Sequence, residues 1–182
     1  MNQAQEIFGE PSERAKGKVR PYMVPWVKDF ICHSPFLVMA SSNAQGACDA
    51  SPKGGKPGFV KVIDDKHLLI PDVAGNRLFQ SYDNISSNAQ IGLVFFIPGI
   101  NTTVRVNGTV RVLRRGEAEF EKLSLEVFQP DENAKLLQAL LLEVVESYSH
   151  CPRAFVFSKL WDVDGIQKNI EQPPIEKWVA GT

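Results

Sequence analysis

The sequence predicts a mainly β domain with flanking helices, built on an antiparallel sheet or barrel. Short apolar runs follow one another from residue 35 to residue 97, separated by clusters of Gly, Asn, Asp and Pro, as in buried strands. A later segment alternates between apolar and polar side chains, which is the period of a strand. Apolar residues at helical spacing occur before residue 34 and after residue 115.

The first 33 residues are predicted to be helical. Pro11 is a suitable first residue for a short helix. An apolar stripe of Trp26, Val27, Phe30 and Ile31 follows at helical spacing. Such a stripe is typical of a helix that covers a core, so we expect this one to pack against the sheet.

The runs FLVMA, GFVKVI, HLLIP and IGLVFFI are predicted to be buried strands. The stretch SPKGGKPGFV, residues 51 to 60, lies between strand-like segments and contains three glycines and two lysines. Glycine lets backbone N–H groups approach an anion, and lysine adds positive charge. Ser51 and Lys53 are therefore candidate anion-binding residues, with a solvated hairpin connection as the alternative.

A second candidate anion site lies in PDVAGNRLFQSYDNI, where a glycine-containing loop leads into a predicted short helix that starts near Asn76. The N-terminus of a helix offers free N–H groups and the positive end of its dipole. Arg77 adds a guanidinium group there, which suits a phosphate.

The clearest strand is predicted in NTTVRVNGTVRVL, residues 101 to 113. Its even positions place valines on one face, and its odd positions place hydroxyl and guanidinium groups on the other, among them Thr103 and Arg105. The alternation continues across Asn107 and Gly108, which favours one long strand with a bulge over a hairpin turn.

After residue 115 the spacing predicts two packing helices, which form a helical insertion over about residues 116–149. The second begins behind Pro130 and the capping candidate Asp131. Its apolar residues are Leu136, Leu137, Leu140, Leu141, Val144, Val145 and Tyr148. RAFVFSKLW then returns to the character of a strand, and its Trp161 is a candidate platform for an aromatic ring.

Length and composition are those of one ordinary globular domain spanning residues 1–182. With 20 basic and 21 acidic residues the net charge is -1, which argues against a nucleic-acid or membrane-surface partner. We expect a cytoplasmic protein, because the sequence has no signal-peptide pattern and no apolar run of membrane-spanning length. Three widely spaced cysteines suit a reducing compartment.

Motifs of other enzyme classes are missing from the sequence. It contains no nucleophile triad signature, Walker loop, G-x-G-x-x-G fingerprint or C-x-x-C pair. The pairs Cys32–His33 and His150–Cys151 could each supply metal ligands, but adjacent residues rarely converge on one ion. We therefore predict no metal site.

Five segments in this order resemble those of the pyridoxamine 5'-phosphate oxidase-like, FMN-dependent proteins. They are SPFLVMAS, DASPKGGKPGFVKV, LLIPDVAGNRL, IGLVFFIPGINTTVRVNGTVRV and HCPRAFVFSKLWD. The resemblance runs from about residue 6 to residue 165. It implies a split β-barrel, and a homodimer that binds two FMN molecules in clefts at the subunit interface.

The resemblance also implies roles for individual residues. Ser51 and Lys53 would stand near the ribityl-phosphate, and Asn76 and Arg77 would replace the Ser-Arg phosphate clamp of the oxidase. Thr103 and Arg105 match the Q-V-R strand of the oxidase, with threonine in place of glutamine. Trp161 falls near the C-terminal segment that in relatives closes over the flavin from the neighbouring subunit.

Two departures bear on the activity. Leu78 stands where the oxidase has a phosphate-binding lysine, and Lys53 is a candidate to compensate for the lost charge. The oxidase's C-terminal R-L-x-P motif is missing, which argues against vitamin B6 oxidation.

The sequence thus predicts an FMN-dependent oxidoreductase that acts on a small-molecule substrate or reductant, without indicating which. It assigns no catalytic residue, and His150 and Arg153 are only candidates for charge placement near the ring or for substrate contact. The alternative is a non-enzymatic protein that binds or stores flavin, deazaflavin or haem on the same barrel.

Overall fold

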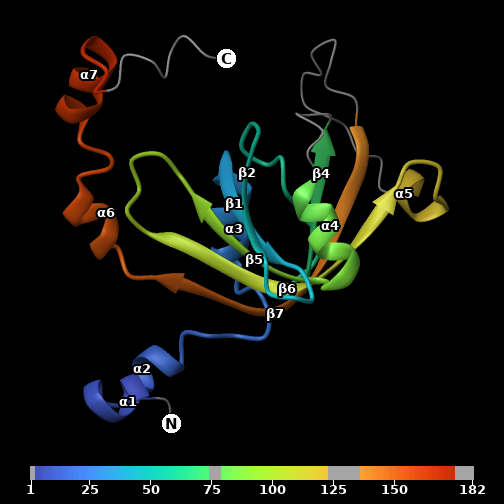
Figure 1. Ribbon diagram of the computed structural model, residues 1–182, viewed down its shortest axis with the longest axis horizontal. Helices are drawn as coiled ribbons and strands as arrows, with labels where there is room; N and C mark the ends of the chain where they lie inside the picture. The colour runs from blue at the N-terminus through green and yellow to red at the C-terminus, as the bar shows by residue number, and fades with distance from the viewer. Residues whose placement is uncertain (1–2, 74–78, 123–135, 175–182) are drawn as a thin grey trace.

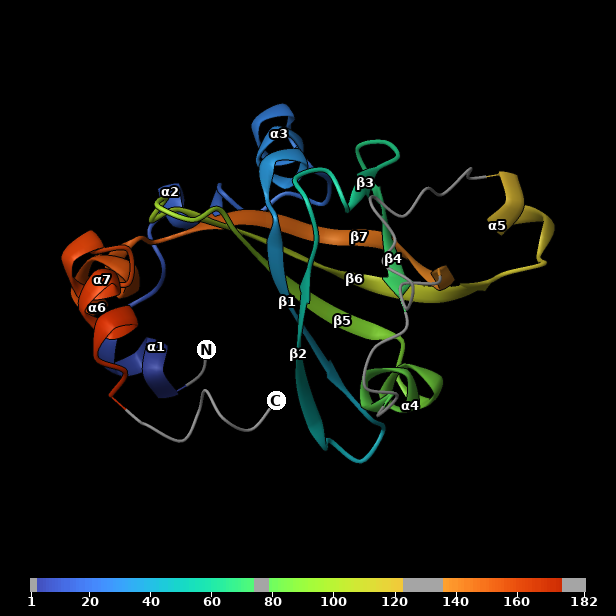
Figure 2. The same ribbon diagram turned by 90° about the horizontal axis from the view of Figure 1, so that it is seen from above.

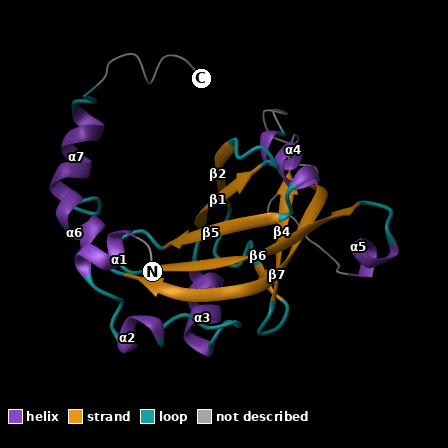
Figure 3. Ribbon diagram, turned by 60° about the horizontal axis from the view of Figure 1, so that its bottom comes forward, coloured by secondary structure: helices purple, strands orange, loops and turns teal. Residues whose placement is uncertain are grey.

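Seven antiparallel strands form one sheet in the order β2-β1-β5-β6-β7-β4-β3 in the computed structural model, which describes residues 3–73, 79–122 and 136–174 (Figure 1). The strands are β1 (Phe36–Ser42), β2 (Cys48–Gly54), β3 (Lys61–Val62), β4 (His67–Val73), β5 (Gln90–Phe96), β6 (Thr103–Arg114) and β7 (Leu136–His150). The helices lie around the sheet (Figure 3). The prediction of a mainly β fold with flanking helices is confirmed.

The sheet curls into a split barrel, and its interior is apolar. Lys53 on β2 reaches Asp72 on β4, with 3.3 Å between Nζ and Oδ1, so the two sides of the sheet approach each other there. Every strand except β2 contributes to the main core or packs against it. Its fully buried side chains include Leu37, Met39, Leu93, Phe95, Val104, Val106, Leu140 and Leu142.

Strand β6 confirms the prediction of one long strand with a bulge. Val104 and Val106 face the core, and the pairing with β7 shifts between Asn107 and Gly108. A Cβ atom on Gly108 would lie 2.0 Å from the carbonyl oxygen of Glu143, so only glycine fits where the two backbones approach.

Three helices precede the sheet, as predicted for the first 33 residues. They are α1 (Gln3–Phe8), α2 (Glu13–Lys16) and α3 (Pro25–His33). Helix α3 buries Val27 and Ile31 of the predicted stripe, whereas Trp26 on the same helix is exposed. This helix covers the side of the sheet that includes β3, β6 and β7.

The helical insertion predicted over residues 116–149 is wrong in its second half, where residues 136–150 form strand β7. The interior face of β7 buries Leu140, Leu142 and Val144. Its outer face near one end packs Ala139 and Leu141 in a second small core, with Phe120 of helix α5 (Ala118–Lys122). Leucines therefore occupy both faces, and that run imitates helical spacing. Pro130 and Asp131 lie outside the described residues.

The strand predicted at RAFVFSKLW is also wrong, because residues 153–158 form helix α6 (Arg153–Ser158), followed by α7 (Val163–Glu171). Both helices lie beyond the end of the sheet, away from the barrel (Figures 1 and 2). The helix predicted to start near Asn76 begins later, as α4 (Gln80–Ser87). Among the described helices, none has the length and apolarity needed to cross a membrane.

Candidate functional site

A polar patch lines the place where β2 approaches β4, which we call the seam. It comprises Asp49, Ser51 and Lys53 on β2 and Asp72 on β4. Along β2 these three residues pair with Ser41, Met39 and Leu37 of β1. Residues directly opposite each other in an antiparallel pair share one face, so the three β2 side chains face the barrel interior. The structure therefore brings the predicted residues Ser51 and Lys53 together on the inner side of the seam.

The ion pair between Lys53 and Asp72 is largely shielded from water. The side chains are 16% and 13% exposed, respectively. Asp72 was not among the predicted site residues. The sequence does contain an indication of it, because Asp72 is a single acidic residue near the end of the apolar run HLLIPDV. Acidic side chains are seldom buried in a strand unless they are paired. The pair gives the seam one cation and one anion in fixed positions.

Helix α4 closes the seam with two further polar side chains. The hydroxyl of Ser81 donates a hydrogen bond of 2.7 Å to Oδ2 of Asp49. The hydroxyl oxygen of Tyr82 is buried and has no hydrogen-bond partner among the described residues. Burial, followed by the negative charge of Asp72, raises the pKa of Tyr82. Tyr82 therefore stays protonated at neutral pH and can donate a hydrogen bond.

The backbone just before α4 is unusual. Phe79, the residue that precedes the helix, has φ of 52° in the left-handed region, which non-glycine residues seldom adopt. No side chain caps the helix. The predicted phosphate-binding residues Asn76 and Arg77 precede Phe79 and lie outside the described residues, so their roles stay predictions.

The other predicted strand residues, Thr103 and Arg105, lie on β6. They pair with His150 and Tyr148 of β7. Arg105 alternates with the inward-facing Val104 and Val106, so its side chain belongs to the outer face of the barrel. The structure therefore does not bring Arg105 together with Ser51 and Lys53, because the wall of the barrel separates the two groups.

The outer face around Arg105 is polar and incompletely paired. The Nε atom of Arg105 is buried and has no hydrogen-bond partner within the described ranges. Burial, and then the positive charge of Arg105, lower the pKa of His150. Nearby, Asn107 donates a hydrogen bond of 2.7 Å to Glu146. A Cβ atom on Gly92 would lie 2.9 Å from Oδ1 of Asn107, so this glycine leaves room for the amide.

Trp161 is the last member of a row of aromatic rings that runs from the sheet to the C-terminal helices. Phe36 and Phe96 lie 5.8 Å apart between ring centroids, as do Phe96 and Phe155. Phe155 stacks on Trp161 at 6.0 Å. The indole Nε1 donates to the carbonyl oxygen of Ile100 at 3.2 Å. Phe155 therefore packs α6 against β5, and Trp161 bonds to the loop between β5 and β6. The contact of Trp161 with a flavin ring stays a prediction.

No group of three or more His, Cys, Asp or Glu side chains that could hold a metal ion occurs within residues 3–73, 79–122 and 136–174. Cys32, Cys48 and Cys151 are exposed and free of disulfide bonds.

Comparison with known proteins points to one family. The family model for pyridoxamine 5'-phosphate oxidase matches residues 23–151, which include all seven strands. Among solved structures, a candidate pyridoxamine 5'-phosphate oxidase from Lactobacillus delbrueckii is 21% identical, with a TM-score of 0.54 over 71% of this chain and 95% of that one. HupZ from Group A Streptococcus is 18% identical, with a TM-score of 0.50 over 70% and 93%. At such identities the likeness concerns the fold. No curated protein matches the sequence.

Proposed function

Because the chain belongs to the pyridoxamine 5'-phosphate oxidase family, we propose that it is a flavoprotein that binds FMN and acts as an oxidoreductase on a small molecule. The observation that carries this proposal is the family match, which includes both strands of the seam. The same match also covers the outer face around Arg105.

The side chains at both places suit a flavin phosphate and its polar ring system. Tyr82 and Arg105 each hold a buried polar atom without a partner, and these are the two such side-chain atoms within the described residues. Lys53, which pairs with Asp72, and Ser51 supply a cation and a hydroxyl group on the inner face of β2. Charged hydrogen-bond donors of this kind bind phosphate groups. An isoalloxazine ring is bound by apolar side chains together with a few hydrogen-bond donors at fixed positions. The donor set therefore fits the group.

When bound, FMN supplies the hydride chemistry, and the residues of this chain bind and orient it. Lys53 would neutralise the phosphate, together with Arg77 as the sequence predicts. Tyr82 remains protonated and offers a hydrogen bond from the wall of the seam. Arg105 lies on the other side of the barrel wall, so it would not contact the same part of FMN as Lys53. In the homodimer that the sequence predicts, that face would belong to a site shared by two subunits.

The test is a titration of apo protein with FMN and with riboflavin, which lacks the phosphate. A charged hydrogen bond contributes about 1.5–3 kcal/mol, so Arg77→Ala should weaken FMN binding by about ten- to a hundredfold and leave riboflavin binding unchanged. Lys53→Met should act in the same direction. Lys61→Met, at an exposed position on β3, is the matched control. If the variants lost equal affinity for FMN and for riboflavin, Arg77 and Lys53 would not bind the phosphate.

Two further measurements separate the proposed enzyme from a binder. The absorption spectrum of the purified protein distinguishes FMN from deazaflavin and from haem. Reduction of the bound flavin followed by its reoxidation in air, with a turnover that depends on added substrate, is the expected result for an oxidoreductase. A bound ligand that never cycles would instead make the protein a carrier.

We also propose that the protein is a homodimer. Helices α6 and α7 bury none of their residues, and they expose the apolar side chains Val156, Phe157, Val163, Ile166 and Ile170. Val163, Ile166 and Ile170 lie three and four positions apart, so they form one stripe along α7. An apolar stripe of this kind is typical of an interface. Light scattering at micromolar concentration, with a monomeric mass as the contrary outcome, tests the assembly.

A further inference from the structure

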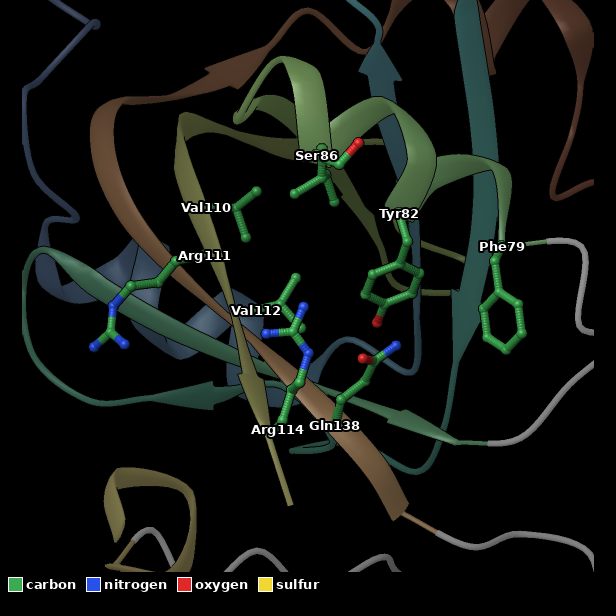
Figure 4. A pocket seen from close by; sticks show the side chains of 9 residues that line it. Phe79, Tyr82, Ser86, Val110, Arg111, Val112, Arg114 and Gln138 are labelled. Atoms are coloured by element: carbon green, nitrogen blue, oxygen red, sulfur yellow. The ribbon is translucent and has the colours of Figure 1, made fainter. Parts of the chain in front are cut away.

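A pocket next to the seam lies under helix α4, where β6 ends and β7 begins (Figure 4). Its volume is about 510 Å³, which is within the range of pockets that take small organic ligands. Phe79, Val110 and Val112 supply apolar walls, and Tyr82, Arg114 and Gln138 supply polar groups. Lys53 and Asp72 do not line it, but Tyr82 belongs to both places and Asp72 pairs with Gln138 across β4 and β7, so the pocket adjoins the ion pair of the seam.

The two arginines that line the pocket differ in how closely each is paired with a carboxylate. Arg111 forms a hydrogen-bonded ion pair with Glu119, and this bond raises the pKa of Arg111. The guanidinium of Arg114 lies 3.9 Å from the carboxylate of Glu117, with its side chain 71% exposed. In Figure 4 the head of Arg114 lies beside Val112, on the side of Tyr82 and Gln138, whereas Arg111 points away. Arg114 is therefore the cation that a ligand in the pocket would meet.

Two neutral donors complete the polar side of the pocket. The hydroxyl group of Tyr82 lies beside Gln138 and the carboxylate of Asp72, although no hydrogen bond of normal geometry joins it to a described residue. Gln138 pairs with Arg114 of β6 on one side and with Asp72 of β4 on the other, so the three side chains share one face. A guanidinium, a phenol and an amide thus converge beside apolar walls. Such an arrangement suits an anion that carries an apolar body.

We propose that this pocket binds a small amphipathic organic anion. Its carboxylate or phosphate would accept hydrogen bonds from Arg114, Tyr82 and Gln138, and its apolar or aromatic body would lie against Phe79, Val110 and Val112. The proposal shares Tyr82 with the flavin proposal, but its cation is Arg114 rather than Lys53, and it needs no redox chemistry.

Isothermal titration with three matched probes tests the proposal on the protein as purified. Naphthoate and naphthyl phosphate carry the charge, and naphthamide has a similar shape without it. We expect one molecule of at least one charged probe to bind per chain, about tenfold or more tighter than naphthamide, as for one charged hydrogen bond. Comparison of the two charged probes shows whether a carboxylate or a phosphate is preferred.

Variants then locate the binding. Arg114→Gln should weaken binding of the charged probe by about ten- to a hundredfold. Arg115→Gln removes the same charge from the next residue, which does not line the pocket, and should have no effect. Ser86→Trp fills the pocket from an exposed position on α4 and should abolish binding of all probes, with melting temperatures confirming that each variant folds.

Several outcomes would overturn the proposal. These are failure of both charged probes to bind, equal affinity for naphthamide and the charged probes, and equal losses in Arg114→Gln and Arg115→Gln. Displacement of the probe by FMN would also overturn it, because the pocket would then belong to the flavin site. If FMN did not bind to the protein at all, the preference of the pocket for charged probes over naphthamide would still be expected. The two proposals can therefore be contradicted independently of each other.

Discussion

The two faces of strands β5 and β6 differ in how complete they are. Inside the barrel, Leu93, Phe95, Val104 and Val106 are fully buried against apolar neighbours. On the outer face of the same strands, Val94 keeps partial exposure and Arg105 holds a buried nitrogen without a partner. The inner face is thus closely packed and apolar, whereas the outer face keeps a polar atom without a partner among the described residues.

The terminal helices extend this contrast. Helix α3 buries Val27 and Ile31 against the barrel, but α7 buries none of its residues. Amphipathic helices gain most of their stability from packing an apolar face. This exposed apolar stripe of α7 is the feature that supports the proposed homodimer.

The largest effect is expected from a pair of neighbouring substitutions on β5. Leu93→Ala removes a fully buried side chain and should lower the free energy of unfolding by about 2–5 kcal/mol. Val94→Ala, one residue later on the outer face, should cost less than about 1 kcal/mol. Urea unfolding of both variants measures the difference. Similar losses would mean that the outer face is as well packed as the core.

A smaller effect is expected when the apolar stripe of α7 is made polar. Replacement of Val163, Ile166 and Ile170 by serine should weaken the dimer by about a hundredfold, because about 3 kcal/mol of apolar burial would be lost. The stability of the barrel at subunit concentrations where it is monomeric should not change. The control replaces Lys168 and Asn169 by serine, and analytical ultracentrifugation gives the dissociation constants. An unaltered dimer in the triple variant would place the interface elsewhere.

The seam allows a test of intermediate size. Lys53→Met leaves the carboxylate of Asp72 unpaired and should cost about 2 kcal/mol, less than the ~3–5 kcal/mol of a fully buried pair because both side chains retain some contact with water. The double variant Lys53→Met with Asp72→Leu should recover most of that loss. If the double variant were no more stable than the single one, the two charges would not be coupled.

The fold was predictable from sequence where the spacing of apolar residues fitted a strand and did not fit a helix. Alternation across Asn107 and Gly108 identified β6 and its bulge, because only a strand places valine at every second position. Residues 136–148 fit both periods, because β7 is covered on the inside by the barrel and on the outside by Phe120. The coverage of each face is a tertiary property, and the local pattern does not contain it.

The candidate site was predictable only in part, because its residues come from elements that are distant in the sequence. Basic and hydroxyl side chains next to glycine identified Ser51 and Lys53. Their neighbours Asp72 and Tyr82 come from β4 and α4, and they meet β2 only because the sheet curls. The alternation of β6 placed Arg105 on a polar face, but it could not show that the wall of the barrel separates Arg105 from Lys53.

The smallest effect concerns His150 on the outer face. The folded protein lowers its pKa below the ordinary value of about 6.5, first by burial and then by the charge of Arg105. Because folding disfavours the protonated ring, its contribution to stability is present above about pH 6.5 and is lost as pH falls through the lowered pKa. The group is largely solvated, so screening keeps this contribution small.

Arg105→Met removes the second of the two causes, so the pKa of His150 should rise part of the way towards its ordinary value. An NMR titration of the imidazole protons measures this shift directly. Arg115→Met, at the residue that follows the other end of β6, is the control and should leave the titration unchanged. In urea unfolding at about pH 8 and about pH 5, the acid-induced loss of stability should be slightly smaller in Arg105→Met than in the control. A pKa that did not move would mean that burial alone acts on His150. The outer face would then lack the electrostatic link between Arg105 and His150 that sets it apart from the apolar interior.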